Sequence, residues 1–327
     1  MRRMLLLVAG SLIIAVGCSK PTLTFKLSVT PTPPSWSSDG FITAFEKAKT
    51  VVKTISITDP VDWWQLRGQD SNDSKTYNDA QIYNALRGDL TVFVQVDPYV
   101  QRKGSLDQCL PESKRGKGLT FASPEIRDAY TADVMLRVKL YKPEFIVLVM
   151  EADAYADEHP EDIANLVSLV EAVRGKIKTE SPSTTVAVSF QYENITGSVD
   201  GRERWDNMRR WQAMDAIAFT TYPASLVPAY ADPQRIPSDY YSRAAKYTAK
   251  PILFAEVGWP ASDAAGEVRQ KDFLSRLATL WKPLPVKIAN YYFLYDCFGF
   301  GPTFDYMGLI TKDGREKQAL SAWRNLR

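Results

Sequence analysis

The chain has 327 residues, 45% of them hydrophobic, so it can bury a large core and is not a disordered protein. Its 40 Lys and Arg nearly balance 38 Asp and Glu, which excludes the basic excess typical of a general nucleic-acid binder. His159 is the only histidine, which excludes a His-rich metal site and leaves acid–base chemistry mainly to carboxylates, Lys, Tyr or Cys.

The first 17 residues are typical of a secretion signal. Arg2 and Arg3 give a positive start, and the apolar run 4–15 is shorter than the ~20 residues of a bilayer-spanning helix. The segment 14–19, IAVGCS, resembles a bacterial lipobox, in which the cysteine, here Cys18, is lipidated and becomes the new N-terminus. We therefore expect a signal peptide at 1–17, a lipidated tether at 18–24, and an exported protein anchored to the cell envelope. Loss of both arginines would leave 38 basic and 38 acidic residues.

From residue 25 onward, short apolar and β-branched runs alternate with segments of helical periodicity, as in parallel βα units. Two helices are well marked, because Ser123-Pro124-Glu125 and Pro160-Glu161-Asp162 each precede a segment with one apolar face. The apolar runs predict strands at 25–30, 52–58, 90–97, 145–151, 185–190, 215–222, 251–257 and 288–295.

Eight successive βα units predict a (β/α)8 TIM barrel that forms a single domain over residues 25–327, with a long insertion after the third strand. The alternative is a two-lobed, doubly wound α/β protein such as a solute-binding lipoprotein. In a barrel the chemistry lies at the carboxyl ends of the strands. The polar and aromatic residues found there are Asp59, Trp63, Trp64, Asp97, Tyr99, Glu151, Asp153, Gln191, Tyr192, Asn194, Tyr222, Glu256, Trp259, Tyr295 and Asp296.

This set combines acids, amides and aromatic rings, which suits a sugar, because a flat ring packs on the C–H face and polar groups hold the hydroxyls. Trp63, Trp64 and Trp259 are the candidate platforms, with ordinary core filling as the alternative for each. The aspartates could bind sugar hydroxyls or a divalent cation, but they have no recognisable cation-loop spacing. We expect no metal and no cofactor.

Two glutamates end apolar runs, Glu151 in the fourth and Glu256 in the seventh. A lone carboxylate inside such a strand would be costly to bury, so both are expected to face the polar mouth of the barrel. A retaining glycosidase needs two carboxylates about 5–5.5 Å apart, one to attack the anomeric carbon and one to protonate the leaving oxygen. The alternative is that one or both glutamates pair with a Lys or Arg of the rim.

The segment 254–262, FAEVGWPAS, is similar to the nucleophile segment of plant-type endo-β-1,3-glucanases and, more loosely, of endo-β-1,4-galactanases. The segment 216–223, AIAFTTYP, resembles the strand-six segment of the same clan, glycoside hydrolase clan A. The resemblance implies that Glu256 is the nucleophile, Glu151 the acid/base and Tyr222 a hydroxyl that orients the nucleophile. It also implies a protonated Glu151 and an ionised Glu256 in the resting enzyme, with apolar Met150 favouring neutral Glu151 and the Tyr222 hydroxyl favouring charge on Glu256.

The chain departs from the clan at two positions. Clan A enzymes usually carry Asn immediately before the acid/base Glu, where this chain has Met150, and the Arg usual at the end of strand two is missing. Asn194 or Gln191 could replace the contact of the missing Asn to the sugar 2-hydroxyl.

The sequence therefore predicts a monomeric surface lipoprotein that hydrolyses a β-linked polysaccharide or oligosaccharide by a retaining two-carboxylate mechanism. The alternatives are a catalytically weak carbohydrate-binding lipoprotein with the same cleft and, for a two-lobed fold, the solute-binding protein. Cys109 and Cys297 are the cysteines left after lipidation of Cys18, and they could form a disulfide or remain reduced.

Overall fold

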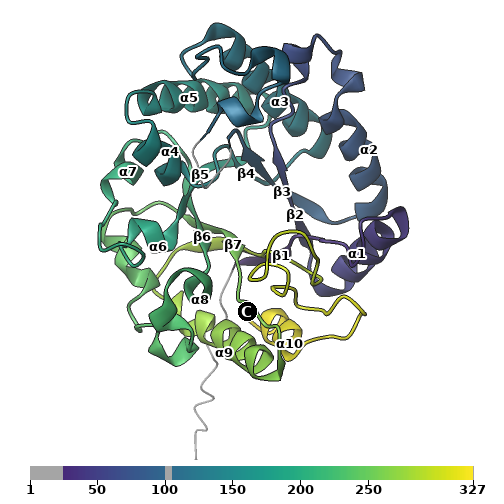
Figure 1. Ribbon diagram of the computed structural model, residues 1–327, viewed down its shortest axis with the longest axis vertical. Coiled ribbons are helices and arrows are strands. Elements are labelled where there is room, and N and C mark those ends of the chain that lie inside the picture. Colours follow the sequence, from purple (N-terminus) through teal and green to yellow (C-terminus); the bar gives the residue numbers. More distant parts are fainter. Residues whose placement is uncertain (1–24, 100–104, 327) are drawn as a thin grey trace, which may run out of the picture.

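The computed structural model describes residues 25–99 and 105–326. Eight parallel strands close into one barrel in which each strand is hydrogen-bonded to the next in the sequence and β8 returns to β1 (Figure 1). The strands are β1 (Lys26–Val29), β2 (Thr54–Pro60), β3 (Thr91–Asp97), β4 (Phe145–Val147), β5 (Thr185–Gln191), β6 (Ala216–Thr221), β7 (Ile252–Val257) and β8 (Val286–Tyr291). The predicted barrel is thus confirmed.

Helices surround the barrel as an outer ring (Figure 1). Both marked helices are confirmed, although the second begins at Ile163, after the Pro160 turn. The helices are α1 (Ser38–Val51), α2 (Lys75–Arg87), α3 (Pro124–Tyr141), α4 (Ala152–Glu158), α5 (Ile163–Glu180), α6 (Tyr192–Ile195), α7 (Asp206–Arg209), α8 (Pro223–Leu226), α9 (Ala264–Leu280) and α10 (Gln318–Arg324).

The strands are apolar throughout because both of their faces are covered. On β3, Phe93 belongs to the cluster that fills the barrel interior, whereas its neighbours Val92 and Val94 belong to the larger core shared with the helices. This double burial explains why continuous apolar runs, rather than alternating ones, located the strands correctly.

Two strands end four residues earlier than predicted. The fourth was expected to reach Glu151, but β4 ends at Val147 and the chain bends away over residues 148–150, although Leu148 still donates its N–H to the Ala187 carbonyl at 2.9 Å. The eighth was expected to reach Tyr295, but β8 ends at Tyr291. These two ends decide which side chains reach the barrel mouth.

The single closed barrel is not the two-lobed architecture that a solute-binding lipoprotein would need. The predicted signal peptide, the tether and Cys18 lie outside the described residues. Within residues 25–99 and 105–326, no helix is long and apolar enough to cross a membrane.

Candidate active site

Glu256 lies near the end of β7 and is only 3% exposed. Its Oε2 accepts a hydrogen bond from the hydroxyl of Tyr222, which follows β6. Its Oε1 is buried and accepts no hydrogen bond from the described part of the chain. One carboxylate oxygen is therefore fixed by Tyr222, and the other is left for a ligand atom.

Glu151 lies beyond β4, at the N-cap of α4, with φ 50° and ψ 54°. This left-handed conformation is unfavourable for a residue with a side chain. Three contacts hold it: the Glu151 N–H donates to Ser189 Oγ at 2.8 Å, and the Tyr99 hydroxyl lies 2.9 Å from the Met150 carbonyl and 3.2 Å from the Glu151 carbonyl. Strained backbone of this kind concentrates at functional sites.

The strain predicts a stability order among variants. Because glycine adopts positive φ without penalty, Glu151→Gly should be more stable than Glu151→Ala by about 1 kcal/mol. Urea unfolding of the two variants measures this difference. Lys142, with φ 48°, is the matched control, and Lys142→Gly should have a higher free energy of unfolding than Lys142→Ala for the same reason. Equal stability of the two Glu151 variants, with a difference at Lys142, would contradict the positive φ at Glu151.

Both glutamates accept hydrogen bonds from hydroxyl groups at the carboxyl end of β6. Thr220 donates its hydroxyl to Oε1 of Glu151 at 2.8 Å, and Tyr222, two residues further on, donates to Glu256. The two glutamates therefore bond to side chains only two residues apart in the sequence, at the carboxyl end of β6.

Asp97 adds a third carboxylate at the end of β3. Its Oδ1 is buried without a hydrogen-bond partner among the described residues. Burial, and then the charge of Glu151, raise the pKa of Asp97 well above its usual range. The mouth thus presents carboxylate oxygens that need hydrogen-bond donors, which sugar hydroxyls can supply.

Burial raises the pKa of Glu256 to about 8, an effect that the Tyr222 hydrogen bond opposes and that the charges of Glu151 and Asp97 increase. This raised pKa runs against the expectation of an ionised Glu256 in the resting protein. The sequence predicted the Tyr222 hydroxyl beside Glu256, but it did not predict how deeply β7 buries the Glu256 carboxyl group.

Tyr292 is a mouth residue that the sequence analysis missed. It follows the true end of β8, and its ring lies 5.9 Å from that of Tyr222. Burial raises its pKa well above the usual range, and the charges of Glu256, Glu151 and Asp97 add to the effect, which places its hydroxyl near all three acids. Had the predicted strand been ended at Tyr291, Tyr292 would have been a candidate, but the apolar run continues to Tyr295 and hides the strand end.

Amide side chains support Glu256 from inside the barrel. Gln95 of β3 and Asn290 of β8 donate their NH2 groups to the Ala255 carbonyl at 2.9 and 3.0 Å. Gln95 also donates to Ser56 Oγ at 2.6 Å. These bonds anchor the residue before Glu256 to the neighbouring strand β8 and, across the barrel interior, to β3.

Gly258 allows Tyr222 to reach Glu256. A Cβ at this position would lie 2.6 Å from the Tyr222 ring and 2.7 Å from Met307 Sδ. Real side chains do not approach so closely, so the glycine of the 254–262 segment provides the space for the tyrosine.

Gly258→Ala is therefore expected to push Tyr222 away from Glu256 and to lower kcat/KM by roughly 10–100-fold, as expected for loss of a positioned hydrogen bond. Gly175→Ala is the control, because its Cβ would meet nothing within 4 Å in helix α5 and should leave kcat/KM unchanged. Unchanged activity of the Gly258 variant would show that the Tyr222 contact has no role in turnover.

Several predicted sugar-binding aromatics are instead buried in the core. Trp63 and Trp259 are each 1% exposed, and Trp259 stacks on Phe273 of α9 at 4.8 Å. Trp64 is half-buried in the 3-10 turn Trp64–Arg67. Tyr192 is fully buried and donates its hydroxyl to the Tyr240 carbonyl. These residues cannot offer a ring face to a substrate, with the partial exception of Trp64.

Tyr99 is also fully buried, and its hydroxyl holds the backbone at Glu151 rather than a sugar. It is a positioning residue. Its ring stacks on Tyr155 of α4 at 4.9 Å, which fixes the helix that follows Glu151.

Asp153, Gln191 and Asn194 bond to one another instead of facing the mouth. Asp153 accepts from the Gln191 N–H at 2.9 Å and from Asn194 Nδ2 at 3.3 Å, and burial raises its pKa to about 6. Gln191 donates its side-chain NH2 to Glu193 at 2.5 Å. The expectation that Asn194 or Gln191 replaces the missing Asn therefore finds no support.

Glu193 is a second positioning residue that the sequence did not reveal. It is fully buried and accepts hydrogen bonds from the Thr221 hydroxyl at 2.7 Å, the Tyr222 N–H at 3.2 Å and the Tyr240 hydroxyl at 3.1 Å. It fixes the backbone from which Tyr222 reaches Glu256.

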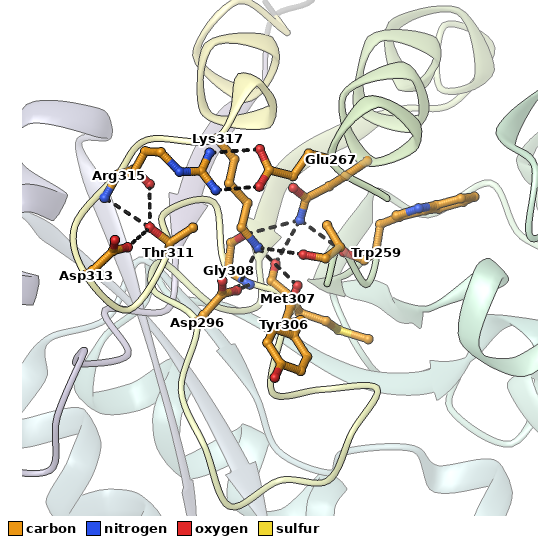
Figure 2. Close-up of polar contacts among 12 residues, drawn as sticks. Trp259, Glu267, Asp296, Tyr306, Met307, Gly308, Thr311, Asp313, Arg315 and Lys317 are labelled. Atoms are coloured by element: carbon orange, nitrogen blue, oxygen red, sulfur yellow. Dashed lines mark hydrogen bonds and ion pairs between the residues drawn. The ribbon is translucent and has the colours of Figure 1, made fainter. Parts of the chain in front are cut away.

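Asp296 and Tyr295 do not reach the two glutamates. Figure 2 shows that Asp296 pairs with the buried ammonium of Lys317, at 2.8 Å, which also donates to the Ala261 and Tyr306 carbonyls. Tyr295 is buried and bridges to Ile310. Both residues fold the long segment after β8 onto the barrel. Their predicted substrate contacts are therefore wrong.

Cys109 and Cys297 are both free thiols, so the possible disulfide is absent and the reduced alternative holds. Within the described ranges, no three His, Cys, Asp or Glu side chains converge into a group that could hold a metal ion.

Three aromatic side chains of the described residues are largely exposed: Trp36, Phe298 and Phe300. Trp36, in the segment before α1, is 61% exposed, and Phe300, after β8, is 44% exposed. Their ring centroids are 6.1 Å apart.

Searches with the sequence found no matching protein-family model and no matching curated protein. The fold resembles solved glycosidase structures. An exo-β-1,4-mannosidase, Op5Man5 from Opitutaceae bacterium strain TAV5, superimposes with a TM-score of 0.70 at 15% identity, covering 92% of this chain and 58% of the mannosidase. A GH5_18 protein from Streptomyces cattleya in complex with GlcNAc gives 0.67 at 14%, covering 93% and 79%.

A β-glucuronidase from Ruminococcus gnavus gives a TM-score of 0.57 at 14% identity, covering 92% of this chain and 50% of the glucuronidase. The chain therefore spans 58% of the length of the mannosidase and half the length of the glucuronidase. The shared feature is the eight-stranded parallel barrel, and the chain has the fold of these glycosidases.

Proposed function

We propose that this protein is a retaining glycoside hydrolase that cleaves a β-linked polysaccharide or oligosaccharide. The observation that carries the proposal is that Glu151 and Glu256 each accept a hydrogen bond at the carboxyl end of β6, Glu151 from Thr220 and Glu256 from Tyr222, the residue after the strand. The glycosidases that share the barrel, with activity on mannosides and glucuronides by name, support the reaction class.

In the proposed first step, Oε1 of Glu256 attacks the anomeric carbon while Tyr222 holds Oε2. Glu151 gives its proton to the leaving oxygen. In the second step Glu151 takes a proton from water, which attacks the glycosyl-enzyme ester and restores Glu256. Because burial raises the pKa of Glu256 to about 8, turnover below that pH requires the proton to pass from Glu256 to Glu151 before the leaving group departs.

The experiment is a screen of the mature protein against β-glucan, galactan, mannan, glucuronides and exopolysaccharides, followed by NMR of the first product formed. A retaining enzyme releases the β-anomer first, before mutarotation. Initial release of the α-anomer would show inversion and would contradict the assignment of Glu256 as nucleophile.

A second candidate is a carbohydrate-binding protein with little activity, and Met150 favours it. Its side chain is fully buried, with Sδ 3.6 Å from the Ser189 hydroxyl, so no amide reaches the sugar 2-hydroxyl from this position. That contact supplies several kcal/mol in the usual mechanism. Binding of a polysaccharide without any released reducing sugar would favour this candidate.

We also propose export and lipid anchoring through Cys18, with the barrel acting as a monomer outside the cell. The support is the charged start, the apolar run and the small residues before Cys18. Metabolic labelling with a fatty acid should mark the wild type and not Cys18→Ala. Label on both proteins would contradict lipidation at this cysteine.

A further inference from the structure

A pocket of about 170 Å³ opens between the ends of β1, β2 and β8 and helices α1 and α2. It is smaller than the ~300–1,000 Å³ of sites for drug-sized ligands, so it suits a single ring. The residues that matter for the argument are Thr30, Trp36, Ser56, Thr58, Tyr292 and Phe300.

The outer walls of the pocket are the two exposed rings, Trp36 and Phe300, which are tilted at 45° to each other. Each ring packs on another aromatic residue: Trp36 lies 6.0 Å from Phe41 and Phe300 lies 5.0 Å from Phe293. Large apolar side chains that are exposed next to each other often mark a binding site for a ligand or another protein. The packing holds both rings ready to receive the C–H face of a sugar.

The floor of the pocket offers hydroxyl groups. Thr58 Oγ1 is buried and has no hydrogen-bond partner among the described residues, whereas Thr30 and Ser56 accept from Asn290 at 3.1 Å and Gln95 at 2.6 Å and still have a hydroxyl proton to donate. Asp59 also lines the pocket, and no Lys or Arg does within the described chain. This lining suits a neutral ring rather than a uronic acid, whose carboxylate would lack a cationic partner.

Tyr292 connects the pocket to the candidate catalytic centre. It lines the pocket, and its ring contacts Tyr222, which donates to Glu256. A sugar in the pocket would therefore lie next to the ring that carries the anomeric carbon under attack.

We propose that this pocket is a subsite for one neutral pyranose ring of the substrate, with Trp36 and Phe300 as its walls and the Thr58 hydroxyl as a polar contact. The inference rests on the proposed function for the identity of the substrate, but the binding it describes does not require turnover.

Binding is tested on Glu256→Gln, which keeps the cleft and does not consume the ligand. The probes are manno-, cello-, laminari- and galacto-oligosaccharides of two to five sugars, measured by calorimetry. Trp36→Ala and Phe300→Ala, each added to Glu256→Gln, are expected to weaken binding by roughly tenfold, which corresponds to about 1.4 kcal/mol for a lost ring contact.

Phe298→Ala is the matched control, because Phe298 is 46% exposed in the same segment but does not line this pocket. It should leave the Kd unchanged. Trp36 is the one of the eight tryptophans that is largely exposed, so ligand binding should also change tryptophan fluorescence, and Trp36→Phe should remove the change.

The outcomes separate this proposal from the proposed function. Loss of affinity in both wall variants, with no hydrolysis by the wild type, would support the subsite and reject the enzyme. Hydrolysis by the wild type, with wall variants that bind as Phe298→Ala does, would overturn the subsite alone. Failure of every neutral probe to bind, or tighter binding of an oligouronate, would also overturn it.

Discussion

Replacement of Glu256 by Gln is expected to lower kcat/KM by more than roughly 10⁴-fold on whichever polysaccharide the wild type cleaves, because an amide cannot form the glycosyl ester. The fold should remain, since Gln has the same size and can still accept the Tyr222 hydrogen bond through its carbonyl oxygen. Reducing-sugar release and circular dichroism measure the two properties. Activity within tenfold of the wild type in the folded variant would reject Glu256 as the nucleophile.

The same variant is expected to change how stability depends on pH. The pKa of Glu256 is raised from 4.5 to about 8 by burial, so its contribution is fully present below pH 4.5 and is lost as pH rises through 8. Gln remains neutral, so Glu256→Gln should gain stability over the wild type between these values, on the order of 3 kcal/mol at pH 7. Urea unfolding at pH 5 and pH 7.5 measures the gain. Parallel pH dependence of the two proteins would contradict the raised pKa.

The sequence located the barrel because burial on both faces makes each strand a continuous apolar run. The same property hid the strand ends. Leu148, Val149 and Met150 are as buried as β4, and two of them still hydrogen-bond to β5, but their backbone bends out of the strand conformation, which hydrophobicity does not report. For this reason Glu151 was placed on the strand, and its left-handed backbone could not be foreseen.

The candidate site was predicted in part, because residue type alone does not tell an exposed aromatic ring from a buried one. Trp259 and Trp36 are both tryptophans near strand ends, but α9 covers the first, whereas the second is left 61% exposed. Tyr292 was missed because the apolar segment continues after β8. Glu193 was missed because its partners, Thr221 and Tyr240, come from distant parts of the chain.

The pH profile of kcat/KM should fall as pH rises through about 8, because the mechanism needs one proton on the pair of glutamates and the pair loses its last proton as Glu256 titrates. Variants of its two neighbours should move this limb in opposite directions. Tyr222→Phe removes the hydrogen bond that lowers the pKa of Glu256, so the limb should move to higher pH. Asp97→Asn removes a negative charge that raises it, so the limb should move to lower pH.

The direction of the shift separates electrostatic from structural effects. Either substitution could lower kcat/KM at every pH by disturbing the mouth, but a purely structural loss would leave the limb in place. Measurement of kcat/KM from pH 5 to pH 10 on one substrate therefore distinguishes an electrostatic effect of each substitution from a structural one. A limb that moves the same way in both variants, or in neither, would mean that Tyr222 and Asp97 do not control the proton on Glu256. The raised pKa would then have to come from burial alone.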